Sequence, residues 1–209
     1  MTIAMRPSGP APRHLVAAGC VLVALSGAIM WWLPAGTSDN GADYDPLAEV
    51  CIVAPALPYD PSSGLALDAP RALPDDARCP VCGMFPARYP AWAAQVIFRD
   101  GATHFFDSPV NLMVFLRDPS RFSNYTAEDV LAAYVNDVPS RSWTPAAKAF
   151  FVHGSNALGP MREGNLPAFT GRDAAERFAS ERGGVVLTLP DIGPDILNTL
   201  VTSVHHQHH

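Results

Sequence analysis

The chain reads AAQVIFRDGATHFFDSPV over residues 93–110. Residues 93–98 and 103–106 are runs of apolar, aromatic and β-branched side chains. The Asp-Gly pair at 100–101 between them is a strong signal for a tight hairpin turn. The Asp-Ser-Pro sequence at 107–109 then predicts a helix start, because Asp or Ser caps the first turn and proline fits within it. This stretch therefore predicts a β-hairpin followed directly by a helix.

The same order of elements occurs again further along the chain. Residues 149–153 and 166–169 are strand-like, and residues 172–182 are helix-like. Thr170 is the expected N-cap of this second helix, and two glycines after residue 182 are a typical helix stop. The second half of the chain therefore predicts another hairpin followed by a helix.

A strand-like run closes each of these units, at residues 134–138 in the first and at residues 185–189 in the second. The mixture of strands and helices indicates an α+β domain, which we place at residues 78–200. Within this domain we expect two tandem β-β-α-β modules, at about residues 78–140 and 141–192.

The stretch before the first hairpin, CPVCGM at residues 79–84, carries two thiols and a thioether. Soft sulfur donors suit a soft ion, above all Cu(I), better than a hard cation. Gly83 would let the backbone bend so that Cys82 and Met84 can face one ion. Thiol spacing alone leaves a disulfide and one half of a zinc site open as alternatives.

Two further residues are candidate ligands for the same ion. Met161 follows Gly-Pro in a predicted loop, where either ligation or burial explains it. His104 alternates with apolar residues of a predicted strand and is either a ligand or a surface residue. The candidate metal ligands are therefore Cys79, Cys82, Met84, Met161 and His104.

A thiol–disulfide oxidoreductase is the alternative function for the Cys-x-x-Cys pair. Reactive pairs of this kind lie at a helix N-terminus, which lowers the pKa of the attacking thiol. Gly83, Pro86 and Pro90 follow the pair here, so no helix is expected to begin directly after it. Asp107 is explained by helix capping, and no nucleophile-elbow motif is present, so we do not expect an enzyme.

Taken in order along the chain, these features resemble the NosL family, which consists of copper-binding accessory proteins of nitrous oxide reductase. The resemblance covers residues 78–192. It is carried by Cys79-x-x-Cys82-Gly83-Met84, the Asp100-Gly101 hairpin with Phe106 and Met113, Tyr134-Val135-x-Asp137, Trp143, Phe151-Val152-x-Gly154-Ser155, Gly159-Pro160-Met161, Pro167-x-Phe169 and Gly183-Gly184.

The resemblance implies a periplasmic metallochaperone that binds Cu(I) and is not an enzyme. It also implies two β-β-α-β modules with a fold similar to that of organomercurial lyase. Proteins of this family pass copper towards the CuZ or CuA centres of nitrous oxide reductase. The expected partner is therefore nitrous oxide reductase or another multicopper protein that receives copper.

The N-terminal part of the chain predicts a membrane anchor. Two arginines precede an unbroken apolar run at residues 15–33, which is long enough to cross a bilayer as a helix. We expect residues 1–13 in the cytoplasm and residues 14–35 as a signal anchor in a bacterial inner membrane, with the rest of the chain in the periplasm. A cleaved signal peptide is one alternative. NosL proteins are typically lipoproteins, so cleavage and acylation at Cys20 is the other.

The remaining segments are polar or rich in proline. We expect residues 36–77 to form an extended linker that holds the domain away from the membrane. Four histidines lie in a His-rich tail at residues 201–209, which would bind Cu(II), Ni(II) or Zn(II) weakly or be a disordered end. The formal net charge of −6 argues against a nucleic-acid-binding surface.

Overall fold

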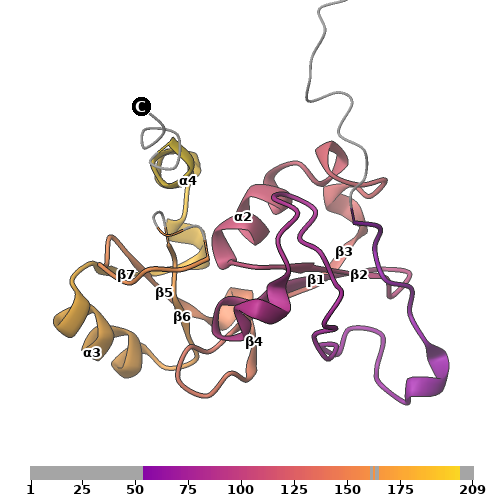
Figure 1. Cartoon of the computed structure of the whole chain (residues 1–209), viewed down its shortest axis with the longest axis horizontal. Helices are drawn as coiled ribbons and strands as arrows, with labels where there is room; N and C mark the ends of the chain where they lie inside the picture. Colours follow the sequence, from indigo (N-terminus) through magenta and orange to yellow (C-terminus); the bar gives the residue numbers. More distant parts are fainter. Residues whose placement is uncertain (1–53, 161, 163–164, 203–209) are drawn as a thin grey trace, which may run out of the picture. The chain divides into compact units, whose positions relative to one another are not determined.

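The computed structural model describes residues 54–160, 162 and 165–202 (Figure 1). The predicted signal anchor at residues 14–35, Met161 and most of the predicted His-rich tail lie outside these residues. Within the described ranges, no helix is both long enough and apolar enough to cross a membrane. The described part contains the thiol pair and both halves of the predicted domain.

The first module is a four-stranded antiparallel sheet with a helix. Its elements are β1 (Ala94–Phe98), β2 (Thr103–Phe106), α2 (Pro109–Arg117), β3 (Val130–Asn136) and β4 (Trp143–Pro145). The strand order is β2-β1-β3-β4, so β1 is a central strand. β3 begins at Val130, earlier than the strand predicted at residues 134–138. β4 was not predicted; it lies in the range expected for the second module, residues 141–192, but pairs with β3 and so extends the first sheet.

The second module has a three-stranded antiparallel sheet. Its elements are β5 (Phe150–His153), β6 (Ala168–Phe169), α3 (Arg172–Arg182) and β7 (Val185–Thr188). The strand order is β6-β5-β7, so the strand after the helix again pairs with the first strand of the hairpin. A further helix, α4 (Pro194–Thr202), follows the second module and contacts α2. Both halves therefore contain the predicted β-β-α-β order.

Short 3-10 helices connect these elements. They are η1 (Pro61–Ser63), η2 (Pro86–Arg88), η3 (Pro90–Trp92), η4 (Pro119–Arg121), η5 (Ala127–Asp129), η6 (Ala146–Lys148) and η7 (Leu189–Asp191). Among the 3-10 helices of the described residues, four begin at a proline. Proline fits the first turn because its missing N–H is not needed there. The prolines therefore mark short ordered turns.

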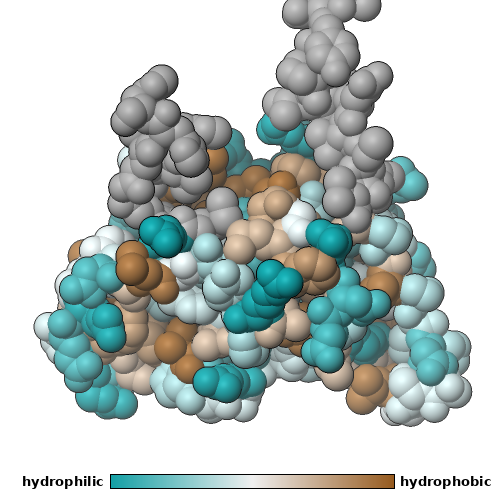
Figure 2. Space-filling view, viewed as in Figure 1, coloured by the Kyte–Doolittle hydropathy of each residue, from teal (hydrophilic) through white to brown (hydrophobic). Residues whose placement is uncertain are grey.

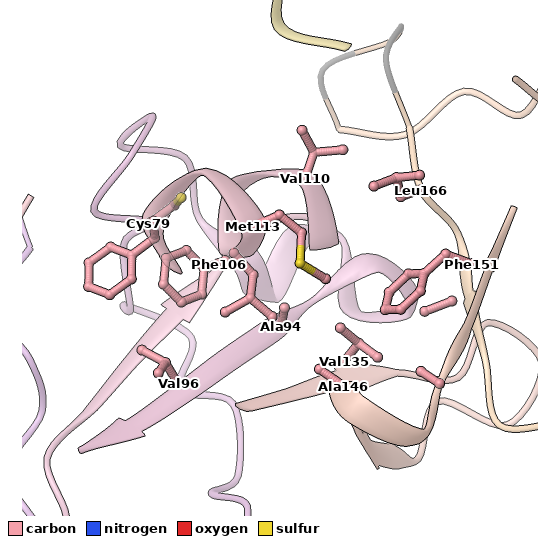
Figure 3. Close-up of a cluster of buried hydrophobic side chains, with 14 of the residues drawn as sticks. Cys79, Ala94, Val96, Phe106, Val110, Met113, Val135, Ala146, Phe151 and Leu166 are labelled. Atoms are coloured by element: carbon pink, nitrogen blue, oxygen red, sulfur yellow. The ribbon is translucent and has the colours of Figure 1, made fainter. Parts of the chain in front are cut away.

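One buried apolar core contains residues of both modules (Figure 3). Phe106 of β2 and Met113 of α2 belong to it together with Phe151 of β5 and Leu166 from the loop before β6. Each of these side chains is at most 4% exposed. Cys79 belongs to the same core, so the thiol loop is attached to the packed interior of the protein.

The two longer helices of the modules begin differently. The Ser108 side chain accepts a hydrogen bond from the Asn111 backbone N–H and caps α2, as predicted. The prediction of Thr170 as the N-cap of α3 is wrong, because Gly171 occupies that position without a side-chain cap. The Thr170 hydroxyl instead shares a hydrogen bond of 2.6 Å with the Thr144 hydroxyl of β4, and so connects the two modules.

Residues 54–77 pack against the first sheet, although residues 36–77 were expected to form a free linker. Leu57 and Thr103 exchange two backbone hydrogen bonds of 2.9 Å. The buried Gln95 side chain accepts a hydrogen bond from the Arg71 N–H at 2.8 Å and donates one to the Arg71 carbonyl at 3.0 Å. The prolines of this segment exclude an α-helix, but they allow the 3-10 helix η1 and do not prevent packing, so the linker prediction is corrected for residues 54–77.

Candidate metal centre

The thiol loop, residues 79–84, is closed by two backbone hydrogen bonds. The Cys79 N–H donates to the Met84 carbonyl, and the Gly83 N–H donates to the Cys79 carbonyl, each at 2.8 Å. Gly83 has a φ of 74°, a left-handed conformation that residues with a Cβ rarely adopt. The glycine therefore allows the chain to turn back directly after Cys82.

Three potential ligand groups meet at this loop. Sγ of Cys79, Sγ of Cys82 and a carboxylate oxygen of Asp107 all lie within 4.8 Å of one another. Cys79 and Asp107 are fully buried, whereas Cys82 is partly exposed. Asp107 follows the last residue of β2 and precedes the N-cap of α2, so the end of the hairpin delivers the carboxylate to the thiols.

Asp107 and Asn111 form hydrogen bonds with the partly exposed thiol of Cys82. Cys82 Sγ donates to Asp107 Oδ1 at 3.2 Å. Asn111 Nδ2 donates to the same carboxylate oxygen at 2.8 Å and to Cys82 Sγ at 3.3 Å. The second oxygen, Asp107 Oδ2, is buried without a hydrogen-bond partner among the described residues. A buried carboxylate oxygen of this kind is costly unless it meets a proton or a cation, so the group favours cation binding.

The buried thiol is held in its protonated form in the metal-free protein. Burial raises the pKa of the Cys79 thiol well above its usual value, and the neighbouring Cys82 and the negative charge of Asp107 raise it further. A metal ion must therefore displace this proton when it binds. The raised pKa also disfavours attack by Cys79 on a disulfide, since the thiolate is the nucleophile.

The backbone directly after the thiol pair does not form a helix N-terminus that would stabilise a thiolate. The next helical elements, η2 and η3, are 3-10 helices of three residues each, and η2 begins only at Pro86. No α-helix begins directly after Cys82, as predicted. The helix N-terminus that activates a redox Cys-x-x-Cys pair is therefore missing from this described segment.

The structure brings some of the predicted ligands together and not others. Cys79 and Cys82 lie in one group, and Met84 is partly buried in the same loop. Met161 lies outside the described residues. His104 does not belong to the group and is not on the surface either, because its side chain is only 2% exposed.

His104 lies in an aromatic cluster of the core. Its ring meets those of Phe98 and Phe115 edge to face, with centroids 5.6 and 5.4 Å apart, and Nε2 has no hydrogen-bond partner among the described residues. Burial lowers the pKa of His104 from 6.5 to about 4. The imidazole is therefore neutral in the folded protein at physiological pH.

We expect this burial to make the protein sensitive to acid. The pKa of His104 is lower in the folded protein than in the unfolded chain. The contribution of His104 to the free energy of unfolding is therefore fully present above pH 6.5 and is lost as the pH falls towards 4. At pH 5 the loss from His104 alone is about 2 kcal/mol. Urea unfolding at pH 7.5 and pH 5 should show a smaller decrease for His104→Phe than for the unchanged chain. Equal decreases would contradict this assignment.

Asp107 and Asn111 were missed as site residues by the reasoning from sequence. Asp107 was assigned to capping, but Ser108 caps the helix and the Asp107 carboxylate faces the thiol of Cys82. The available signal was the spacing of Asp107 and Asn111, because residues four apart lie on the same face of a helix start. That signal becomes specific only when the thiol loop is known to lie nearby.

The fold and the site together define a small mixed α/β protein with a group of two thiols and one carboxylate. A family model described as NosL matches residues 70–197, well over half of the chain. The chain belongs to the NosL family.

Two relatives illustrate the match. The copper-binding lipoprotein NosL of Achromobacter cycloclastes is 32% identical over 123 residues, which cover 53% of this chain and 61% of that protein. The chain thus spans about three fifths of the length of this curated relative. The crystal structure of the copper chaperone NosL from Shewanella denitrificans is similar in fold. The TM-score is 0.55 and the identity 24%, over 61% of this chain and 98% of that chain.

Proposed function

We propose that this protein is a copper-binding accessory protein that carries one Cu(I) ion at the thiol loop. Cys79 and Cys82 are the proposed thiolate ligands, and Met84 is a further sulfur donor from the same loop. A carboxylate oxygen of Asp107 lies within 4.8 Å of both sulfur atoms. The observation that carries this proposal is the meeting of two free thiols and a buried carboxylate at a closed loop. Soft sulfur ligands in small number suit Cu(I).

The unequal burial of the two thiols suits a carrier that must release its ion. Cys79 is buried in the core, whereas Cys82 is partly exposed. An acceptor can therefore replace Cys82 first, while Cys79 still holds the copper. Both thiols lose a proton when copper binds. Asp107 Oδ1, which already accepts the Cys82 hydrogen bond, is the first acceptor for the Cys82 proton, and both protons finally pass to the solvent, so the carboxylate keeps its negative charge.

Titration of the reduced protein with Cu(I) tests this function. We expect uptake of one Cu(I) per chain in competition with a Cu(I)-specific chelator, because the thiol loop offers one compact group of soft donors. Binding should release protons, which can be measured in a weakly buffered solution. Uptake well below one ion per chain would contradict the proposal.

We further propose that the copper acceptor is nitrous oxide reductase or another multicopper protein in the periplasm. The support is membership of the NosL family and the names of its relatives as copper-binding lipoprotein and copper chaperone. Transfer of copper to the metal-free reductase, followed by recovery of its activity, would test the choice of acceptor.

The proposed attachment to the inner membrane is by an uncleaved signal anchor at residues 14–35. The name of the Achromobacter relative supports membrane attachment but indicates a lipid. We expect the full chain in the membrane fraction with Met1 intact, because the apolar run is long enough to span the bilayer. Intact-mass analysis distinguishes the two routes, since a mature chain that begins at acylated Cys20 would contradict the anchor.

A further inference from the structure

Two arginines share one aromatic ring beside the thiol loop. The Arg78 guanidinium carbon lies 4.1 Å from the centroid of the Phe85 ring, and that of Arg88 lies 4.9 Å from it. Arg78 also donates a hydrogen bond of 3.2 Å to the Gly83 carbonyl, next to Cys82. Both arginines are exposed. The ring therefore keeps two cationic groups close together at the edge of the thiol loop.

Among the described residues, no carboxylate forms an ion pair with these two guanidinium groups. In the part of the chain that the structure describes, the one ion pair joins Arg172 and Glu176 on α3. Asp76 lines the same surface hollow as Arg78 but forms no ion pair with it. Two like charges at one ring repel each other, and the negative faces of the aromatic ring offset part of that repulsion.

The sign of this local charge is opposite to that of the whole molecule. The chain carries a formal net charge of −6, yet the edge of the thiol loop presents two guanidinium groups that form no ion pair among the described residues. Figure 2 shows hydrophilic and hydrophobic residues interspersed over the visible face of the molecule. A local charge of opposite sign orients an approaching partner and raises the rate of productive encounters.

We propose that Arg78 and Arg88 form a cationic rim that docks an acidic segment of the protein that exchanges Cu(I) with Cys82. This inference rests on the proposed copper transfer and adds the chemistry of the partner surface. The rim receives carboxylates, and the acceptor ligands then meet the exposed thiol. Phe85 restrains both arginines, so little side-chain entropy is lost on docking.

Copper transfer to charged model acceptors tests the rim. Two synthetic peptides share a central Cys-Ala-Ala-Cys and carry either four flanking glutamates or four flanking lysines. We expect the copper-loaded full chain to transfer Cu(I) to the acidic peptide about tenfold faster than to the basic one at low ionic strength. The preference should shrink in high salt, because salt screens exposed charges.

Substitutions identify the residues responsible for this preference. Arg78→Glu with Arg88→Glu should abolish or invert it, and Arg88→Glu alone should remove part of it without touching the Gly83 hydrogen bond. The matched control is Arg177→Glu with Arg182→Glu on α3, which changes the net charge equally and should keep the preference. Equal rates for both peptides with the unchanged chain, or an equal loss in the control, would overturn the rim.

Failure of the proposed copper function and failure of the proposed rim give different experimental results. If the unchanged chain does not load Cu(I), the copper function is wrong, and the rim is then tested with metal-free peptides in which serine replaces both cysteines. Fluorescence anisotropy should still show tighter binding of the acidic peptide by the unchanged chain than by the Arg78→Glu, Arg88→Glu variant. Equal binding by these two proteins would overturn the rim as well.

Discussion

Substitution of both Cys79 and Cys82 by serine is expected to abolish Cu(I) uptake against a competing chelator. The two thiols provide the only thiolate ligands of the group at the loop, and a serine hydroxyl is a hard, neutral donor at pH 7. Neither Met84 nor Asp107 can replace two thiolates for a soft ion. The measurement is the copper content per chain after equilibration with the chelator under reducing conditions.

Two controls make this result specific to the loop. Cys51→Ser removes a different thiol and should leave uptake unchanged, because Cys51 lies outside the thiol loop in sequence. The double variant must also remain folded, since Cys79 belongs to the buried core. Its circular dichroism and urea unfolding should therefore be recorded beside the titration. Full uptake by a folded double variant would exclude the loop as the copper site.

Local signals explain which elements could be predicted from the sequence. The hairpin of β1 and β2 has an Asp-Gly turn, and α2 has its serine cap and first-turn proline, so these elements depend on neighbouring residues only. The predicted helix at residues 172–182 has the bounds of α3. β4 has no such signal, because its three residues include Pro145 and are a strand only through pairing with β3.

Alternation along a strand failed to place His104 because both faces of its strand are covered. All four residues of β2 are buried, and so are all five of β1. α2 contacts these strands, the Gln95 side chain of β1 bonds to the Arg71 backbone, and Leu57 pairs with the outer edge of β2. An alternating pattern distinguishes buried from exposed residues of a strand only when one face of the sheet meets water. The prediction for His104 considered a ligand or a surface residue and left out a buried core residue.

The sulfur half of the site could be predicted, and the oxygen half could not. Cys79 and Cys82 are close in sequence, so their meeting requires only the turn at Gly83. Asp107 lies 25 residues after Cys82, and only the path of the chain through β1 and β2 brings the two side chains together. Such a contact depends on the tertiary fold, which a single sequence does not specify through local patterns.

Replacement of Asp107 by asparagine is expected to weaken Cu(I) binding by about 10- to 100-fold at pH 7, the usual effect of removing a group that supports metal ligands. Asparagine keeps the shape but loses the negative charge that faces both thiols. Its amide also places N–H donors in a buried region where Asp107 Oδ2 has no partner among the described residues. The measurement is the competition titration with the same chelator.

Two effects of this substitution oppose each other, and their relative size decides the result. Loss of the carboxylate removes its attraction for the cation and the acceptor of the Cys82 proton. It also removes one cause of the raised pKa of Cys79, which reduces competition from protons. That second effect is partial, because burial and the neighbouring Cys82 contribute more to the raised pKa of Cys79 than Asp107 does and both remain. We therefore expect the loss of attraction for the cation to decide the result.

The Ser108→Ala variant distinguishes an effect of the Asp107 charge on copper binding from an effect of the position of the α2 start. Loss of this N-cap should cost about 1 kcal/mol of folding stability, because the Asn111 backbone N–H loses its partner. The carboxylate next to it is unchanged, so the copper affinity should stay within about twofold of that of the unchanged chain. If Ser108→Ala weakens copper binding as much as Asp107→Asn, the helix start positions the site and the charge does not act on the metal. If Asp107→Asn binds copper as tightly as the unchanged chain, the carboxylate has no part in holding the ion.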